Sequence, residues 1–423
     1  MKPRIWLSLA HMSGREQEFI QEAFDTNWVV PLGPNVNAFE QSLRDFLIEC
    51  GELPTEDKEI RIVALSAGTA ALHLGLILLG VQPGDEVICQ SFTFAASANP
   101  IAYLEATPVF VDSEKETWNM DPVLLEEAIK DRLEKTGKLP KAIIPVHLYG
   151  MPVKMDEVME VANRYGIPVL EDSAEALGSE YKGRKCGTFG EYGVLSFNGN
   201  KMITTSGGGA LICPNEEKAK RALFYATQAR EQAPHYQHEK IGYNYRMSNI
   251  CAGIGRGQMT VADAHVAHHK HTCDLYRELL KDVKGITLHE NPSGRFDSNY
   301  WLNTIVLDPL LRVKGQENAY QATVQGAVGG AGGVTHAAVN AHTDCEPNAN
   351  VEAMRVGLDA MGIESRPLWK PMHKQPVYKN CPAYVNGGSE SLFKVGLWLP
   401  SGPYVTDRDI EYIVGGIRGL IER

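Results

Sequence analysis

The stretch Ile62-Val63-Ala64-Leu65-Ser66-Ala67-Gly68-Thr69 decides the fold class of this 423-residue chain. Its first four residues form a short apolar run that is typical of a strand. Residues 69–79, which follow, are apolar nearly all round, as expected for a buried helix. The junction combines a hydroxyl with small residues at a helix start, where free backbone N–H groups attract anions. A plain helix cap is the alternative interpretation of this junction.

Short apolar runs and helical stretches continue to alternate after this junction. Strands are expected at 86–89, 108–111, 142–146, 169–170 and 194–197, and helices at 94–104, 122–135 and 155–165. This alternation predicts an α/β fold with a mainly parallel central sheet that helices cover on both faces. Ligands of such sheets bind at the carboxyl ends of the strands, so polar residues there are the candidates for chemistry.

The last third of the chain has a different pattern. A long helical stretch over 249–284 precedes strand-like runs at 287–289 and 302–307 and helices at 351–361 and 407–421. We therefore expect a large domain over 1–260 and a small C-terminal α+β domain over 261–423. Residues 314–350, with the glycine-rich run at 329–333, are predicted to be an insertion, either a pocket cover or a surface excursion.

Composition excludes several classes of protein. Hydrophobic residues make up 43% of the chain and charged residues 22%, with a formal net charge of -11. Such a chain can bury a core, which excludes wholesale disorder, and its acidic balance argues against nucleic-acid binding. No apolar run reaches the roughly 18 residues of a membrane span. The eight cysteines form no CxxC pair, which favours reduced thiols in a soluble cytoplasmic enzyme.

Two further motifs follow predicted strands. In the first, a buried strand leads into Glu171-Asp172. A buried carboxylate needs a cationic or donor partner, and a protonated ring nitrogen would serve. The alternative interpretation is that Asp172 is an ordinary N-cap residue. In the second, Ser196-Phe197-Asn198-Gly199-Asn200 leads to Lys201, which could lose its proton and attack a carbonyl, or could simply be solvated. An anion site, then an acid, then a lysine are together typical of pyridoxal phosphate enzymes.

With these motifs, the chain resembles the DegT/DnrJ/EryC1/StrS family of sugar aminotransferases, and the resemblance covers nearly its whole length. The resemblance implies the fold type I architecture of pyridoxal phosphate enzymes, and residues 25–33 resemble the bacillosamine-type branch, which makes 4-amino-4,6-dideoxy-N-acetylhexosamine nucleotides. Besides the Glu171-Asp172 and Lys201 motifs, the resemblance rests on Gly84-Asp85-Glu86-Val87-Ile88, Pro108-Val109-Phe110-Val111-Asp112, Pro145-Val146-His147-Leu148-Tyr149-Gly150 and Gly242-Tyr243-Asn244-Tyr245-Arg246-Met247.

The resemblance also assigns roles to single residues. It implies that Lys201 bonds to the cofactor aldehyde and later moves a proton between the amino donor and the cofactor. Asp172 then binds the pyridine nitrogen, while Gly68, Thr69 and Ser196 hold the phosphate.

Further residues receive less direct roles from the same resemblance. Phe94 is placed to stack on the cofactor ring, and Glu175 stands near the ring hydroxyl, where many relatives carry Gln. Asn244 matches a residue that reaches the cofactor of the neighbouring subunit, which implies a homodimer with shared active sites. An N-terminal segment, 1–35, is expected on the substrate side. Candidate substrate contacts are Asn27, Trp28, Arg366, Lys370 and His373.

The implied reaction is a transamination. Some relatives carry His in place of the lysine and dehydrate sugars, so Lys201 favours amination. L-glutamate is the expected donor; it would convert the cofactor to pyridoxamine phosphate, whose amine then passes to a nucleotide-linked 4-keto-6-deoxy-N-acetylhexosamine for surface glycan or glycoprotein synthesis. The alternatives are amination at C3 or of a keto sugar on a different nucleotide, a pyridoxal phosphate sugar dehydratase, and a non-enzymatic cofactor-binding regulator. A nicotinamide-dependent enzyme is disfavoured because no glycine-rich turn follows the first strand.

A histidine cluster offers one other chemistry. His265, His268, His269 and His271 lie close together, and the first three share a helix face at a spacing that suits a metal. No Cys or carboxylate completes the set in register. A solvated or interdomain helix face is therefore preferred, and no metal site is predicted.

Overall fold

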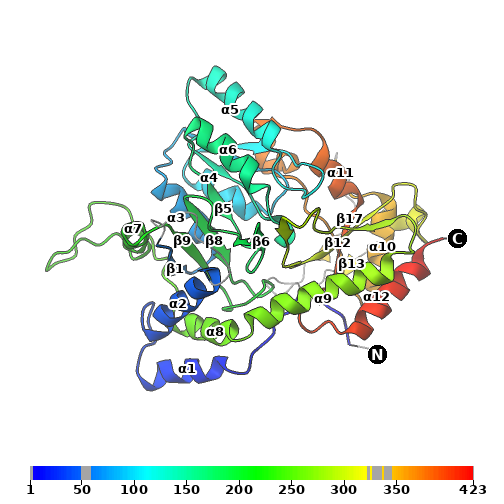
Figure 1. The fold of residues 1–423 in the computed structure, drawn as a ribbon, viewed down its shortest axis with the longest axis horizontal. Coiled ribbons are helices and arrows are strands. Elements are labelled where there is room, and N and C mark those ends of the chain that lie inside the picture. Colours follow the sequence, from blue (N-terminus) through cyan, green and yellow to red (C-terminus); the bar gives the residue numbers. More distant parts are fainter. Residues whose placement is uncertain (1–2, 49–58, 322–323, 326–335, 338–344, 423) are drawn as a thin grey trace.

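Two four-stranded sheets join edge to edge in the larger part of the molecule (Figure 1). The computed structural model describes residues 3–48, 59–321, 324–325, 336–337 and 345–422. Parallel bridges between residues 143 and 169 and between 146 and 172 join the sheets. The strand order across both is β1 (Arg61–Leu65), β9 (Gly209–Cys213), β8 (Tyr192–Ser196), β5 (Leu170–Asp172), β4 (Ala142–Ile144), β2 (Glu86–Gln90), β3 (Thr107–Val111) and β16 (Ala383–Tyr384).

The mainly parallel arrangement predicted from the sequence is confirmed, with one exception. Strand β9 runs antiparallel to both of its neighbours, β1 and β8. The apolar pattern does not reveal β9, because the strand begins at the end of a run of glycines. That run has a structural reason: a Cβ atom on Gly209 would lie 2.3 Å from the backbone nitrogen of Gly68. Only glycine allows β9 to pass so close to the start of helix α3 (Gly68–Leu78).

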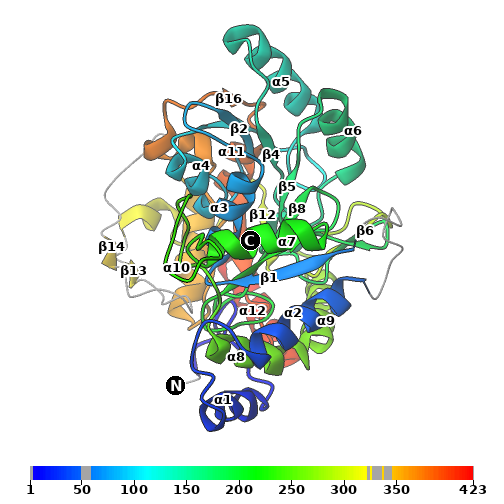
Figure 2. The same cartoon turned by 90° about the vertical axis from the view of Figure 1, so that its left-hand side faces the viewer.

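Helices cover both faces of the joined sheets, as shown by the side chains of β1, which point alternately to one face and the other. Val63 and Leu65 pack into the apolar cluster that includes α3 and α7 (Glu216–Ala226), while Ile62 and Ala64 pack into the cluster of α2 (Pro34–Ile48) on the other face. Figure 2 shows β1 between α7 and α2. The helices of this part are α1 (Glu16–Asp25), α2 (Pro34–Ile48), α4 (Asn99–Tyr103), α5 (Pro122–Thr136), α6 (Met155–Tyr165), α7 (Glu216–Ala226) and α8 (Asn249–Met259).

A smaller antiparallel sheet lies in the C-terminal part and has its own apolar core. Its strand order is β10 (Ile286–Leu288), β12 (Asn303–Leu307), β17 (Gly396–Leu399) and β15 (Arg366–Pro367). The helices of this part are α9 (Ala262–Leu280), α10 (Ala349–Ala360), α11 (Gly388–Val395) and α12 (Asp407–Leu420).

The single helix expected over 249–284 is two helices. Helix α8 ends at Met259 and α9 begins at Ala262. The β-branched residues Thr260 and Val261 lie between them. The Thr260 hydroxyl donates to the carbonyl of Gly257, a local side-chain bond that competes with the backbone bonds of a continuous helix.

Segments from both ends of the chain bind to parts distant in sequence. The backbone N–H of Ile5 donates to the Gly362 carbonyl, and the N–H groups of Ser401 and Gly402 donate to the carbonyl of Leu7. Strand β16 pairs in parallel with β3 of the large sheet. The division into 1–260 and 261–423 stays a prediction.

Short elements complete the described chain. The region predicted as an insertion, 314–350, begins with a 3-10 helix, η3 (Gln316–Gln321), and the glycine-rich run at 329–333 lies outside the described residues. Of the helices described, none is both long and apolar enough to cross a membrane. The remaining elements are β6 (Glu180–Tyr181), β7 (Arg184–Lys185), β11 (Phe296–Asp297), β13 (Val324–Gln325), β14 (His336–Ala337), η1 (Ala95–Ser97), η2 (Leu148–Gly150), η4 (Met372–Lys374) and η5 (Pro376–Tyr378).

Candidate active site

A cavity of about 350 Å³ lies where the large sheet presents the ends of β1, β5 and β8. It is the position at which α/β sheets bind their ligands. Seven residues singled out in the sequence line this one cavity: Gly68, Thr69, Phe94, Asp172, Glu175, Ser196 and Lys201.

One wall of the cavity is the N-terminus of α3. The residue before the helix, Ala67, has an extended backbone, and no side chain caps the helix start. A Cβ atom on Gly68 would lie 3.0 Å from the Cβ of Ser196, so glycine is what lets the end of β8 approach the helix. Backbone N–H groups, the helix dipole and the hydroxyls of Thr69 and Ser196 therefore gather on one side of the cavity. This arrangement suits a phosphate.

The carboxylate of Asp172 lies at the end of β5 and is almost fully buried. Its Oδ2 accepts a hydrogen bond of 2.6 Å from the Ser97 hydroxyl, and its Oδ1 accepts one of 3.2 Å from the N–H of Ala174. The Ser97 hydroxyl is itself 2.7 Å from that of Thr93. Both donors to Asp172 are neutral, so a protonated ring nitrogen inside the cavity would supply the positive charge that a buried carboxylate favours.

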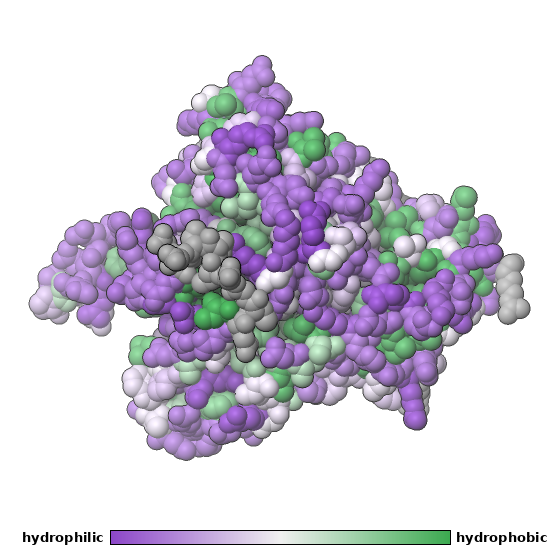
Figure 3. Space-filling view, in the orientation of Figure 1, coloured by the Kyte–Doolittle hydropathy of each residue, from purple (hydrophilic) through white to green (hydrophobic). Residues whose placement is uncertain are grey.

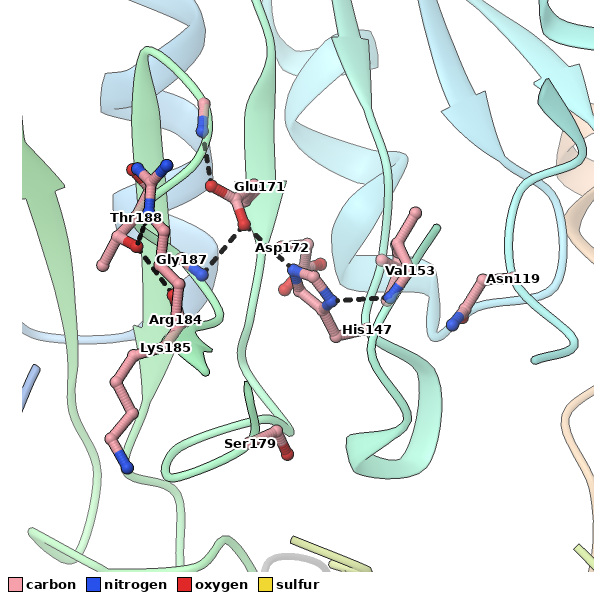
Figure 4. Close-up of polar contacts among 12 residues, drawn as sticks. Asn119, His147, Val153, Glu171, Asp172, Ser179, Arg184, Lys185, Gly187 and Thr188 are labelled. Carbon is pink, nitrogen blue, oxygen red and sulfur yellow. Dashed lines mark hydrogen bonds and ion pairs between the residues drawn. The ribbon is translucent and has the colours of Figure 1, made fainter. Parts of the chain in front are cut away.

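Glu171, the residue before Asp172, is fully buried beside His147 (Figure 4). Its carboxylate accepts hydrogen bonds from His147 Nε2 at 3.0 Å and from the N–H groups of Gly187 and Gly190 at 2.9 and 2.5 Å. The N–H of Val153 donates to His147 Nδ1 at 3.0 Å, so Nε2 is the protonated nitrogen of a neutral ring.

These contacts decide the charge of Glu171. Burial raises the pKa of this carboxyl, but the hydrogen-bonding and electrostatic interactions with His147, together with the N–H groups of Gly190 and Gly187, outweigh burial and leave the pKa below its ordinary value. Glu171 is therefore a buried carboxylate anion. Its bonds fix the end of β5 and, with it, the backbone of Asp172.

Lys201 and Glu175 face each other inside the cavity. The Nζ atom of Lys201 lies 3.2 Å from Oε1 of Glu175 and 4.0 Å from the ring centroid of Trp301. The N–H of Tyr149 donates to the other carboxyl oxygen of Glu175 at 2.7 Å. Burial raises the pKa of Glu175 to about 7, even though the Lys201 ammonium and the Tyr149 N–H act to lower it; the Asp172 carboxylate adds to the rise.

Two tryptophans in the cavity wall were not predicted from the sequence. Trp301 and Trp369 both line the cavity, and the Trp369 ring lies 5.4 Å from the ring of Phe94, which is 56% exposed. Trp369 belongs to the run 364–373, from which only Arg366, Lys370 and His373 were chosen as candidates. Its aromatic side chain is the feature of that run that could have indicated a residue of the cavity wall. Trp301 is fixed by a 2.6 Å hydrogen bond from its indole N–H to the carbonyl of Asn200, a contact that no local pattern predicts.

The other residues predicted for substrate binding do not line this cavity. Arg366 forms a 2.8 Å ion pair with Glu364, and Lys370 lies 3.8 Å from Glu346. The Nδ1 atom of His373 is 2.7 Å from the hydroxyl of Ser91 at the end of β2, and burial lowers the pKa of this imidazole.

The N-terminal candidates and the candidate for the neighbouring subunit also lie apart from the cavity wall. Asn27 has a positive φ of 57°, and the carbonyl of the half-exposed Trp28 accepts a hydrogen bond from the side chain of Asn249. Asn244 is exposed and bridges to Thr227 at the base of the loop after α7. In Figure 1 this loop extends away from the body of the molecule, and its surface in Figure 3 is mostly hydrophilic.

The four histidines of α9 make contacts with backbone carbonyls and a carboxylate. The rings of His265, His268 and His269 face the backbone carbonyls of Met202, Gly402 and Tyr300, at distances of 3.0, 3.1 and 3.2 Å. His271 instead lies 2.9 Å from the carboxylate of Asp407. In the part of the chain that the structure describes, no three His, Cys, Asp or Glu side chains are grouped to hold a metal ion.

Known proteins resemble the chain in sequence and in fold. A sequence model of the DegT/DnrJ/EryC1/StrS aminotransferase family matches residues 11–328 and 316–418. EpsN of Bacillus subtilis, which is named as a pyridoxal phosphate-dependent aminotransferase, is 44% identical over 413 residues, covering 96% of this chain and 93% of EpsN. The GDP-perosamine synthase of Caulobacter vibrioides is 33% identical over 415 residues, covering 98% of each chain. A crystal structure of a DegT DnrJ EryC1 StrS aminotransferase from Brucella abortus superposes with a TM-score of 0.79 at 27% identity, covering 96% of this chain and 95% of that one.

Proposed function

Because the chain belongs to the DegT/DnrJ/EryC1/StrS aminotransferase family and is a pyridoxal phosphate-dependent sugar aminotransferase, we propose that it aminates C4 of a nucleotide-linked 4-keto-6-deoxy-N-acetylhexosamine. The observation that carries the chemistry is the convergence of Lys201, Asp172 and the α3 N-terminus on one cavity. The name of the GDP-perosamine synthase, a relative matched over 98% of its length, supports a nucleotide-linked sugar. The bacillosamine-type substrate rests on the resemblance of residues 25–33.

The chemistry of the cavity fits the parts of pyridoxal phosphate. The uncapped start of α3, with Gly68 where a larger residue would crowd Ser196, fits the phosphate. The buried Asp172 carboxylate, held by neutral donors, fits a protonated ring nitrogen. Lys201 supplies the amine for the aldehyde, and Phe94 supplies an aromatic face at the mouth of the cavity. The cofactor supplies the electron sink for the bond changes at the amino donor and the sugar.

The side chains of this protein then have separate tasks. Asp172 keeps a proton on the ring nitrogen, and the backbone of β5 holds Asp172 in place. Lys201, once released from the aldehyde, is the base that takes a proton from the donor carbon and returns it to the cofactor side. Trp301 and Trp369 form apolar walls that keep water from the reacting atoms.

The sugar nucleotide brings negative charge to an acidic protein. With a net charge of -11, attraction must come from local groups rather than from the overall field. We propose Arg366, Lys370 and His373 for this task, with Asn27 and Trp28 of the N-terminal segment on the same substrate. L-glutamate is the proposed amino donor.

We also propose a homodimer in which Asn244 of one subunit serves the site of the other. Its exposure, and the loop that extends beside it, support this arrangement. A cytoplasmic location is inferred from the cysteine pattern. Surface polysaccharide synthesis is the process in which we expect the product to be used.

Absorption spectroscopy tests the assignment of Lys201. Protein loaded with pyridoxal phosphate should show a visible band that bleaches when L-glutamate is added, and Lys201→Ala should lose this band. Lys185→Ala is a matched control, because Lys185 is also largely buried and paired with a glutamate, but lies outside the cavity. An unchanged band in Lys201→Ala would show that the role given to Lys201 is wrong.

Product analysis tests the substrate. The enzyme should be incubated with L-glutamate and a panel of 4-keto and 3-keto nucleotide sugars, and the products identified by NMR. We expect a 4-amino product from the 6-deoxy-N-acetylhexosamine. Amination of only a 3-keto sugar would replace the proposed substrate with the C3 alternative, and release of a dehydrated, nitrogen-free sugar would indicate a dehydratase.

A further inference from the structure

Glu175 has an arrangement that binding to a ring hydroxyl does not explain. It is buried, at 5% exposure, and its Oε1 is directed at Nζ of Lys201 across 3.2 Å. Its second oxygen is held by the N–H of Tyr149 in η2, so the carboxyl cannot turn freely away from the lysine. The carboxyl is thus anchored on one side and has a proton donor on the other.

The charges around Glu175 make this pair sensitive to the state of the lysine. Lys201, from the loop after β8, is the cation that faces it; Asp172, at the end of β5, is a second carboxylate nearby; and the Tyr149 phenol is buried and neutral, donating no charge. When the Lys201 nitrogen loses its positive charge, Glu175 would be left as an anion beside another anion in a cavity with apolar walls. Such a carboxylate takes up a proton.

We propose that Glu175 accepts the proton that Lys201 must lose before its nitrogen can act as a nucleophile or a base. An N–H bond of the ammonium breaks, an O–H bond forms on Oε1, and the electron pair of that N–H bond stays on nitrogen. The ion pair becomes a neutral amine beside a neutral carboxylic acid, so no charge is created in the cavity and no water is needed. The inference rests on the proposed function, because it gives Lys201 its catalytic role.

The pKa of Glu175, raised by burial to about 7 even with the ammonium beside it, agrees with a carboxyl that can hold a proton at neutral pH. A glutamine at this position could still accept the Tyr149 N–H through its amide oxygen. It could not take a proton from Lys201, because an amide has no basic site in this range. Glu175→Gln therefore removes the proton acceptor and leaves the anchoring contact in place.

Infrared difference spectroscopy tests the proposal without relying on turnover. Spectra of the apoprotein and of the pyridoxal phosphate-loaded protein are compared in H2O and D2O, with glutamate carboxyls labelled with 13C. In the wild type we expect loading to produce a protonated glutamate C=O band that shifts in D2O. Glu175→Gln should lack it. Glu352→Gln is the matched control, because Glu352 is equally buried and paired with Arg355, and it should keep the band.

A second variant keeps the test decisive even if Glu175→Gln does not fold. Lys201→Met removes the cation, so the protonated glutamate band should already be present in its apoprotein. A wild type that gains no such band on loading, a band that persists in Glu175→Gln, or an apo Lys201→Met without the band each overturns the proposal.

Kinetics provide a readout that a structural role would not move. Between pH 6 and 8 the rate at which cofactor attaches to Lys201 should fall about 10-fold in Glu175→Gln and lose the pH dependence seen near 7, while the control variant keeps both. Equal rates and equal pH profiles in the two variants overturn the proposal. If the infrared bands behave as expected but no keto sugar is aminated, the proposed substrate fails and the Glu175 inference stands.

Discussion

Replacing His147 with Phe tests the buried pair at the end of β5. The change keeps a ring of similar size and removes two hydrogen bonds, from His147 Nε2 to Glu171 and from the Val153 N–H to His147 Nδ1, both of 3.0 Å. A hydrogen bond to a charged group contributes about 1.5–3 kcal/mol, and a buried N–H left without an acceptor costs about 1–3 kcal/mol. We therefore expect His147→Phe to lower the free energy of unfolding by roughly 4 kcal/mol.

The assay is urea unfolding of the apoprotein, so that cofactor binding does not add to the stability. His271→Ala is the matched control, since His271 pairs with Asp407 at 2.9 Å with both side chains more than half exposed. We expect this exposed pair to contribute about 0.5 kcal/mol or less. A loss below about 1 kcal/mol for His147→Phe would refute the claim that the pair holds the end of β5.

The same pair makes a prediction about acid. The pKa of Glu171 is lowered in the folded protein, so its contribution to stability is present above the pKa of an unfolded glutamate and is lost as the pH falls through the folded value. Without His147 the folded pKa of Glu171 rises. The acid-unfolding midpoint of His147→Phe should therefore lie at a higher pH than that of the wild type, as followed by circular dichroism, and an unchanged midpoint would contradict the assignment.

Three shorter predictions concern the cavity and its surroundings. Gly68→Ala should raise the dissociation constant of the cofactor about 10-fold, measured by absorption titration, because its methyl group would crowd Ser196; Gly415→Ala, where a methyl would meet nothing within 4 Å, should leave it unchanged. Asp172→Asn should slow bleaching by L-glutamate at least about 100-fold in stopped-flow measurements while cofactor still binds. Burial and the Asp172 carboxylate raise the pKa of the Cys89 thiol, so peptide mapping at pH 8 should find Cys89 unmodified by a thiol reagent until the protein is unfolded.

The sequence predicted those parts of the site that are local in the chain. Residues at or shortly after the end of a strand, such as Asp172 in β5 and Gly68 beyond β1, reach the cavity because parallel strands bring their ends to one edge. Trp301 could not be predicted in this way, since it is placed by packing between distant segments. Apolar periodicity did not predict strand β9, because the strand begins at glycines. Glycine is needed there for the close approach to Gly68, which is a tertiary contact and leaves no periodic pattern in the sequence. The substrate contacts proposed for Arg366 and its neighbours depend on where the ligand binds and on how the subunits are arranged. A pattern of residues close together in the sequence does not contain this information.

The bonds from Ser401 and Gly402 to the carbonyl of Leu7 have a consequence for how the protein is made. A ribosome that adds about 5–20 residues per second needs roughly 20–80 s to pass from residue 7 to residue 401. During that time the carbonyl of Leu7, a residue that is buried in the finished protein, lacks both of these backbone donors. Ser8, in the same segment, donates through its hydroxyl to the carbonyl of Asn200, the residue before Lys201. The N-terminal segment therefore completes its backbone contacts only after residues 401 and 402 have been made.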